Sequence, residues 1–200
     1  MKNSYVQSIR FLFIGRLLYD KGIMEFSDAA RQIKLSYPNV IFEIVGAIDN
    51  NNPSAISQDI VMNWEKELLI KYHGKAEDIR PFLEKADVLV LPSYREGLPR
   101  VILEGMSMAK PIIVTDVPGC RETVVDGENG YLVPVKNSNA LADAMVKMIE
   151  NGQDQRKEMG QKGRELAVDK FDEKIIIQKY TELISSLIIE KEVVTDLLFG

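Results

Sequence analysis

The chain has 200 residues, of which 46% are hydrophobic and 28% charged, and its formal net charge is −5. This balance is typical of a globular protein, and the acidic charge excludes the basic surface of a nucleic-acid-binding protein. No apolar run approaches the roughly 18 residues of a membrane-spanning helix, and the single cysteine, Cys120, excludes an internal disulfide and fits a reducing compartment.

Short apolar runs alternate with longer segments of helical periodicity along the whole chain. The expected elements, in chain order, are a strand at 9–15, a helix at 22–37, a strand at 39–46, a helix at 59–72 that runs into a short strand near 70–73, a helix at 76–86, a strand at 87–93, a helix at 98–109, a strand at 110–116, a turn and short strand within 126–135, and helices at 138–151, 154–169 and 172–190. Pro81 and Pro99 fall in the first turns of their helices, where proline is tolerated.

Most of the expected strands are continuous runs of Val, Ile, Leu and Phe, the pattern of a parallel sheet that is buried on both faces. We therefore predict an α/β fold with a doubly wound, mostly parallel, Rossmann-like sheet of about six strands and extra C-terminal helices. In the common strand order 3-2-1-4-5-6, ligands bind outside the carboxyl ends of strands 1 and 4. The loops at 15–22 and 93–99 would then face the same crevice.

The first of these loops, "GRLLYDKG", places Arg16 and Lys21 beside Gly15 and Gly22, where backbone can approach a ligand closely. The helix that begins near Leu98 would point free N–H groups into the crevice, and its dipole favours an anion. Two cations and a helix N-terminus are suited to binding a diphosphate.

The second loop and its helix, "EGLPRVILE", carry two acids, Glu96 and Glu104, with seven residues between them. Glu104 interrupts an apolar run, and an acid is rarely buried there unless it has a partner. Carboxylates accept hydrogen bonds from hydroxyls, as binding of ribose or a sugar requires. Together the two loops suggest a ligand with a central diphosphate and a polyol on each side, such as a nucleotide sugar.

The same residues carry a resemblance to a known family. The chain resembles the C-terminal, donor-binding domain of the GT-B fold glycosyltransferases, specifically the retaining enzymes of family 4 (group 1). The resemblance covers about residues 9–185 and rests on the order and spacing of "GRLLYDKG", "ADVLVLPS", "EGLPRVILE", "KPIIVTDVPGCRETVVDGENGYLV" and "NSNALADAM". "YREGLPRVILE" with "DVPGCRE" is most similar to members that build capsule, O-antigen or lipid-linked glycans.

The resemblance implies a role for each matching residue. Arg16 and Lys21 would hold the donor diphosphate in the loop that Gly15 opens, and Glu96 would lie near the hydroxyls of the donor sugar; these three side chains would be the catalytic ones. Glu104 would take the ribose hydroxyls. The remaining expected contacts are backbone amides of Gly97, Leu98 and Arg100 on the sugar or distal phosphate, and the segment Gly74, Lys75 and Ala76 beside the base.

Two positions depart from the family pattern. Gly105 replaces the usual alanine after the second glutamate, which weakens helix propensity by up to about 1 kcal/mol. The segment "YHGKAED" matches the family pattern only loosely, so the sequence does not identify the base of the donor. Among the nucleotide sugars, we expect a UDP-sugar. With one histidine and one cysteine, the sequence offers no zinc ligand set, and we expect neither a metal nor a cofactor.

GT-B enzymes have two domains, and this chain has the length of one. We expect residues 1–200 to be a single donor-binding domain, with 170–200 as a C-terminal helical extension. We expect the N-terminal acceptor domain to be absent from this chain, which would then be a fragment or one half of a split enzyme. The whole enzyme would be a hexosyl- or N-acetylhexosaminyltransferase that acts on an acceptor glycan or lipid-linked sugar, while the isolated chain would be inactive. We expect a cytoplasmic location, with peripheral association at the inner face of the membrane left open.

Three alternatives stay open at the level of sequence. The domain could bind a nucleotide sugar without turnover, or belong to an epimerase or a glycogen-type phosphorylase of the same fold, although no lysine is an evident candidate for the pyridoxal group of a phosphorylase.

The helix at 172–190 is apolar around much of its surface. It could pack in the core or, as the resemblance suggests, cross toward a partner domain.

Overall fold

The computed structural model describes residues 8–49 and 51–199, with side chains up to residue 187. The first seven residues of the predicted domain lie outside this description. The strands are β1 (Arg10–Ile14), β2 (Ile41–Val45), β3 (Lys71–Tyr72), β4 (Val88–Leu91), β5 (Ile112–Thr115) and β6 (Gly130–Val133). The α-helices are α1 (Ile23–Ser36), α2 (Gln58–Lys66), α3 (Arg80–Lys85), α4 (Arg100–Ser107), α5 (Ser138–Glu150), α6 (Gly152–Phe171) and α7 (Glu173–Phe199), and short 3-10 turns are η1 (Tyr19–Lys21) and η2 (Arg121–Thr123).

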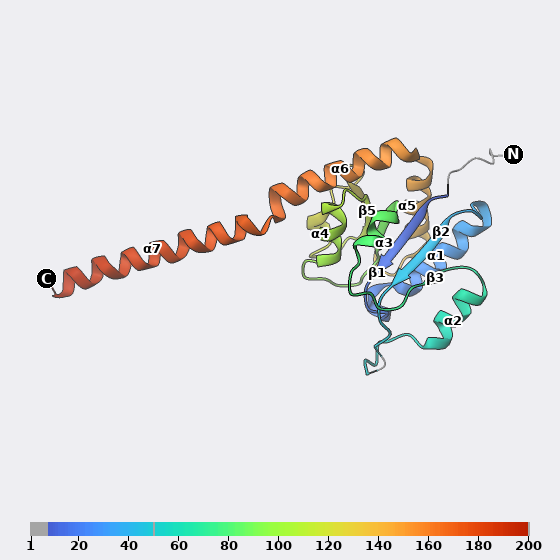
Figure 1. Ribbon diagram of the computed structural model, residues 1–200, viewed down its shortest axis with the longest axis horizontal. Helices are drawn as coiled ribbons and strands as arrows, with labels where there is room; N and C mark the ends of the chain where they lie inside the picture. Colours follow the sequence, from blue (N-terminus) through green and yellow to red (C-terminus); the bar gives the residue numbers. More distant parts are fainter. Residues whose placement is uncertain (1–7, 50, 200) are drawn as a thin grey trace.

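The six strands form one sheet in the order β3-β2-β1-β4-β5-β6, and every neighbouring pair is parallel. The predicted fold class and strand order are confirmed. β1 lies between β2 and β4, with Phe11 opposite both Phe42 and Val88. The loops that follow β1 and β4 therefore leave the same edge of the sheet side by side (Figure 1).

Helices cover both faces of the sheet. Parallel crossovers are right-handed, so the β1-α1-β2 and β4-α4-β5 units, which move in opposite directions from the centre, place α1 and α4 on opposite faces. On one face α1 packs against α5, and on the other α4 packs against α6. The central strands are thus buried between two layers of helices.

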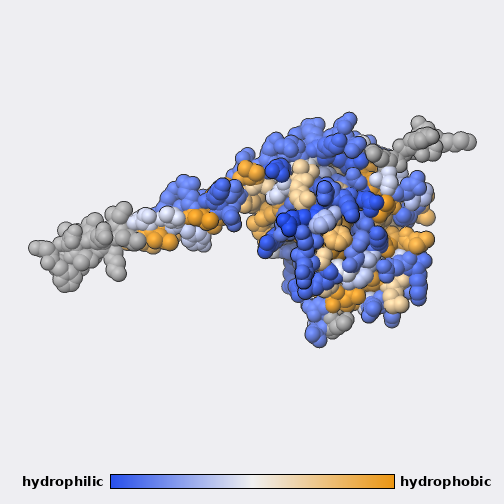
Figure 2. Space-filling view, viewed as in Figure 1, coloured by the Kyte–Doolittle hydropathy of each residue, from blue (hydrophilic) through white to orange (hydrophobic). Residues whose placement is uncertain are grey.

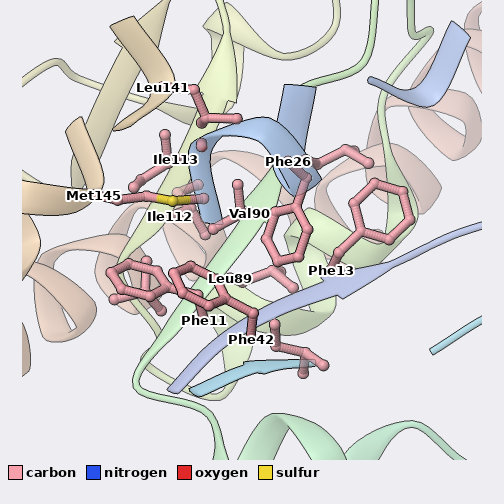
Figure 3. Close-up of a cluster of buried hydrophobic side chains, with 14 of the residues drawn as sticks. Phe11, Phe13, Phe26, Phe42, Leu89, Val90, Ile112, Ile113, Leu141 and Met145 are labelled. Atoms are coloured by element: carbon pink, nitrogen blue, oxygen red, sulfur yellow. The ribbon is translucent and has the colours of Figure 1, made fainter. Parts of the chain in front are cut away.

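Aromatic and aliphatic side chains fill the layer between the sheet and α1 (Figure 3). Phe11 stacks on Phe42 with ring centroids 5.6 Å apart, and Phe26 of α1 meets Phe42 edge to face at 5.9 Å. All three rings are buried, and burying a side chain of this kind stabilises a fold by about 1.5–3 kcal/mol. This core gives the loops at the carboxyl edge a rigid base.

The helices predicted at 59–72 and 76–86 are among those that are shorter in the structure. The helix predicted at 59–72 ends at Lys66, because the chain turns at Leu68, which has a positive φ of 52°, before it enters β3. The helix predicted at 76–86 begins only at Arg80, with Pro81 in its first turn as expected. Residues 76–79 are therefore loop, at the same edge of the sheet as the two loops described above.

The C-terminal helix α7 does not pack into the core. It projects away from the sheet and the other helices (Figure 1), and its exposed large apolar side chains up to residue 187 have exposed fractions between 51% at Ile176 and 61% at Tyr180. Figure 2 shows hydrophobic surface along the part of α7 that is drawn in colour. The core-packing interpretation of this helix is therefore wrong. No helix in the described part of the chain is long and apolar enough to cross a membrane.

Candidate functional site

A cavity of about 360 Å³ opens between the β1 loop (15–22) and the β4 loop (92–99). It is lined by Ile14, Gly15, Arg16, Lys21, Ile79, Leu91, Glu96, Pro99, Arg100, Val101 and Glu104. Six of the residues predicted from the sequence are among them: Gly15, Arg16, Lys21, Glu96, Arg100 and Glu104. The strand order brings these side chains together from segments that are about 80 residues apart.

Lys21 and Glu96 form an ion pair across this cavity, with Nζ and Oε1 2.6 Å apart. Their side chains are only 21% and 13% exposed, so the interaction is less screened by solvent than a surface pair. Lysine has three donors, and one of them is held by Glu96. The sequence placed both residues in the crevice but did not indicate that they bind each other.

Arg16 is held more loosely. Its guanidinium lies 3.6 Å from Oδ2 of Asp49, in the loop after β2, and its side chain is 60% exposed. The backbone beside it is fixed, because Leu17 donates its N–H to the carbonyl of Ala47 at 3.0 Å. Arg16 is therefore a cation on an ordered backbone at the mouth of the cavity, where it is accessible to an anion.

Glu104 shows why an acid stands in the apolar run of α4. Ile102 and Met106 of the same helix are buried, whereas Glu104 lines the cavity and its side chain is 37% exposed. Arg100, one turn earlier, donates from Nε to Oε1 of Glu104 at 3.1 Å. The carboxylate thus borders a polar cleft, as the sequence predicts.

Two glycines hold the β4 loop from either side. Gly22 has a φ of 69°, and a Cβ at this position would overlap the carbonyl of Pro92. Gly119 has a φ of 86°, and a Cβ there would overlap the carbonyl of Gly97. Left-handed backbone in close contact with a neighbour favours glycine at both positions. The backbone that carries Glu96 is thus enclosed between the loops that follow β1 and β5.

Four predicted site residues do not line this cavity. Gly97 and Leu98 lie between Glu96 and Pro99 on the β4 loop, and the contacts of their N–H groups with a ligand stay predictions. Gly74 accepts a hydrogen bond from the N–H of Gly46 at 2.8 Å, and Lys75 lines a separate cavity of about 330 Å³ beside α2 and β3. Their predicted place beside the base likewise stays a prediction.

A larger cavity of about 630 Å³ adjoins the first and shares Ile79, Arg100 and Glu104 with it. Sequence reasoning missed Ile79, because it assigned the segment 76–86 to a helix. Pro81 carried the missing signal: proline favours the first turn of a helix, so the residue two positions earlier belongs to the preceding loop.

The lone cysteine and histidine have structural surroundings. Cys120 is buried, and burial, with Glu96 as a second cause, raises the pKa of its thiol to about 12. The thiolate is therefore scarce at neutral pH. His73 contacts Glu43 through Nε2 at 3.0 Å and packs edge to face on Phe82. Among the described residues no three His, Cys, Asp or Glu side chains are grouped closely enough to hold a metal ion.

Comparison with known proteins places this fold and cavity in a family. The model of the family described as glycosyl transferases group 1 matches residues 2–166, so the chain belongs to the group 1 glycosyl transferases. Its sheet and helices are those of one half of the GT-B fold.

Three similar proteins illustrate the match. The capsular polysaccharide biosynthesis glycosyltransferase CapM of Staphylococcus aureus is 28% identical over 180 residues, 90% of this chain and 47% of CapM. The N,N'-diacetylbacillosaminyl-diphospho-undecaprenol alpha-1,3-N-acetylgalactosaminyltransferase of Campylobacter jejuni is 32% identical over 177 residues, 88% of this chain and 44% of that enzyme. Anabaena HepE, whose structure was solved in complex with UDP, is 26% identical, with a TM-score of 0.79 over 90% of this chain and 49% of its own.

The chain therefore spans about half the length of the relatives that it matches. CapM and the Campylobacter enzyme are named as glycosyltransferases, and they do not favour the epimerase, phosphorylase or simple binding-module alternatives.

Proposed function

We propose that this chain is the donor-binding half of a glycosyltransferase, which transfers a sugar from a nucleotide-diphosphate sugar to an acceptor hydroxyl with retention at the anomeric carbon. The observation that carries the proposal is the cavity between the β1 and β4 loops, where Arg16 and Lys21 meet the carboxylates of Glu96 and Glu104 beside the first turn of α4. The family membership of the chain supports it.

Arg16 and Lys21 bind the diphosphate in this proposal. Arg16 is exposed at the mouth of the cavity, and Lys21 has donors beyond the one that Glu96 holds. As the bond to the sugar breaks, negative charge grows on the leaving nucleoside diphosphate. The two cations stabilise that charge, as a divalent metal does in other transferases.

Glu104 accepts hydrogen bonds from the ribose hydroxyls, and Glu96 lies near hydroxyls of the donor sugar. Amides of Gly97, Leu98 and Arg100 meet the sugar or the distal phosphate, while Gly74 and Lys75 flank the base. UDP is the proposed nucleotide, and the UDP complex of HepE supports this choice.

The transferred group is a hexose or an N-acetylhexosamine, and the acceptor is a glycan or a lipid-linked sugar. CapM is named for capsular polysaccharide biosynthesis, and the Campylobacter enzyme for a diphospho-undecaprenol acceptor. Their names support a place for the whole enzyme in polysaccharide or lipid-linked glycan synthesis. The proposed location is cytoplasmic, with peripheral association at the inner face of the membrane left open.

The other half of the enzyme supplies the acceptor pocket and the second wall of the site. In this proposal residues 1–200 form one domain, and the helical extension at 170–200 reaches toward the other half. The isolated chain leaves the reacting carbon open to water and lacks the groups that position an acceptor. It should bind donor and show no transfer, with at most a trace of donor hydrolysis.

Two matched variants test the carboxylate assignments by calorimetry. Glu104→Gln should weaken the binding of UDP and of a UDP-sugar alike, because both contain the ribose, by about 1.5–3 kcal/mol for a charge-assisted hydrogen bond. Glu96→Gln should weaken only the UDP-sugar. Equal losses on both ligands from both variants would show that the roles are misassigned.

A further inference from the structure

Tyr94 connects the two loops that form the donor cavity. It lies on the β4 loop, two residues before Glu96, and its backbone N–H donates to the carbonyl of Asp20 at 2.8 Å. Its hydroxyl donates to Oε1 of Glu25, in the first turn of α1, at 2.7 Å. Asp20 directly precedes Lys21 and Glu25 follows it by one helical turn, so the two hydrogen bonds bracket Lys21.

The Tyr94 hydroxyl is a dependable donor in these surroundings. Burial, followed by the hydrogen bond and the charge of Glu25, raises its pKa above the ordinary value for tyrosine. Oε2 of Glu25 is buried and meets no hydrogen-bond partner among the described residues. The hydrogen bond from Tyr94 is therefore the one that the Glu25 carboxylate accepts within the described part of the chain. Nζ of Lys136 lies 5.0 Å from the centroid of the Tyr94 ring and fixes its other side.

Other contacts fix the two ends of the β4 loop. Near its start, Thr115 donates its hydroxyl to the carbonyl of Ser93, and the Ser93 hydroxyl donates to the backbone carbonyl of Asp20 at 3.2 Å. Near its end, Gly119 lies against the carbonyl of Gly97. Glu96 stands between these contacts, and Tyr94 is the side chain in this interval that reaches across to α1.

We propose that Tyr94 and Glu25 are a positioning pair for the donor site. Their hydrogen bond sets the separation between Nζ of Lys21 and Oε1 of Glu96, and it thereby aligns the diphosphate end of the site with the sugar end. This inference rests on the function proposed above, in which Lys21 meets the diphosphate and Glu96 the sugar. Neither Tyr94 nor Glu25 lines the cavity, so both act through Lys21 and Glu96.

The first test needs no ligand. In NMR spectra of the full 200-residue chain, we expect the ion pair with Glu96 to slow exchange of the Lys21 ammonium protons with water, and the signal can be assigned by its loss in Glu96→Gln. Tyr94→Phe should abolish or shift this signal while the amide spectrum of the sheet is kept. Glu25→Ala, which removes the acceptor instead of the donor, should do the same. Glu25→Gln keeps an acceptor oxygen and should retain the signal.

Tyr37→Phe is the matched control, because the Tyr37 hydroxyl also donates to a glutamate, Oε1 of Glu150 at 3.3 Å, away from the cavity. It should leave the Lys21 signal unchanged. A Lys21 signal that is the same in Tyr94→Phe, Glu25→Ala and the wild type would overturn the proposal.

The second test uses calorimetry with UDP and with UDP-glucose or UDP-N-acetylglucosamine, whichever the wild type binds more tightly. Tyr94→Phe should lower affinity for the sugar nucleotide at least about threefold and leave that for UDP within about twofold, because a displaced Glu96 weakens its hydrogen bond to the donor sugar, which UDP lacks. In Glu96→Gln, adding Tyr94→Phe should cause no further loss. Equal losses for both ligands would indicate a purely structural role and overturn the positioning pair. Failure of the wild type to bind UDP would instead refute the proposed function. The positioning role of Tyr94 and Glu25 would then be tested by the Lys21 NMR signal alone.

Discussion

Two successive helices, α6 and α7, differ in how they relate to the rest of the molecule. α6 is the more polar in sequence, yet it packs on α4 and buries Met159, Gly160 and Ala167. α7 is richer in apolar residues, and its side chains at Ile176 and Leu183 are 51% and 54% exposed. Hydrophobic content alone therefore does not decide which helix docks.

Close backbone approach explains the docking of α6. A Cβ on Gly160 would overlap the carbonyl of Ala109, and Arg156 donates from its guanidinium to the carbonyl of Met148 at 2.8 Å. α7 has no comparable contact among the described residues up to 187, and its half-exposed apolar side chains recur at positions three, four and seven apart. That spacing is typical of a helix face that packs against a folded core. The comparison teaches that α6 is part of the packed core of this domain. We propose that the exposed apolar face of α7 packs against the other half of the enzyme.

The largest expected effect is a difference in the free energy of unfolding between a substitution in α6 and one in α7. Met159→Ala in α6 should lower the free energy of unfolding by about 2–5 kcal/mol, because it leaves a cavity beneath a buried side chain. Leu183→Ala in α7 should change it by no more than about 0.5 kcal/mol, as for an exposed surface position. Urea unfolding of both variants, followed by the fluorescence of the single tryptophan, Trp64, measures the difference. A Leu183→Ala loss as large as that of Met159→Ala would mean that α7 packs on this domain.

A second variant sharpens the account of α6. Gly160→Ala should destabilise the chain by about 1–3 kcal/mol, because the added methyl group must push α6 away from Ala109, although alanine is the better helix former. Gly152, at the start of the same helix with a φ of 74° and open space around it, gives the control. Gly152→Ala carries backbone strain alone, about 1–2 kcal/mol. A stabilised Gly160→Ala variant in the same unfolding assay would contradict the close-approach argument.

The smallest expected effect comes from removing α7 altogether. A chain that ends at Asp172 should keep its free energy of unfolding within about 0.5 kcal/mol of the full chain, because little buried surface is lost. Cys120 reports the same result independently: it is buried and its pKa is raised to about 12, so reagents for thiols should react slowly with both chains at pH 8. Rapid modification of Cys120 in the shortened chain alone would show that α7 stabilises the domain.

The sheet and the location of the site were predictable because they depend on strong local signals. Continuous apolar runs identify buried parallel strands, and the strand order then brings Arg16, Lys21, Glu96 and Glu104 to one edge. The strands follow from residue type and spacing, whereas the strand order was taken from the common doubly wound pattern.

What sequence could not give depends on contacts between distant atoms. The Lys21–Glu96 ion pair and the place of Ile79 in the cavity wall emerge only when the loops are folded together. Gly105 is a further case: its sequence context showed only a loss of helix propensity, whereas in the structure a Cβ there would meet Cδ2 of Leu89 at 2.5 Å. The direction of α7 likewise follows from the absence of a docking contact within residues 8–187, which composition does not reveal.

The most direct test of the central claim is a calorimetric titration of the 200-residue chain and its Arg16→Ala variant with UDP. We expect the wild type to bind with a Kd on the order of 0.1–1 mM, or about −4 to −5.5 kcal/mol, because half of the enclosing site is present. Binding should weaken as salt is added, since the Coulomb interaction with the diphosphate is screened. Arg16→Ala should lose about 1.5–3 kcal/mol, the contribution of a charge-assisted hydrogen bond. An affinity for UDP that is unchanged in Arg16→Ala would contradict the assignment of this cavity as the diphosphate site.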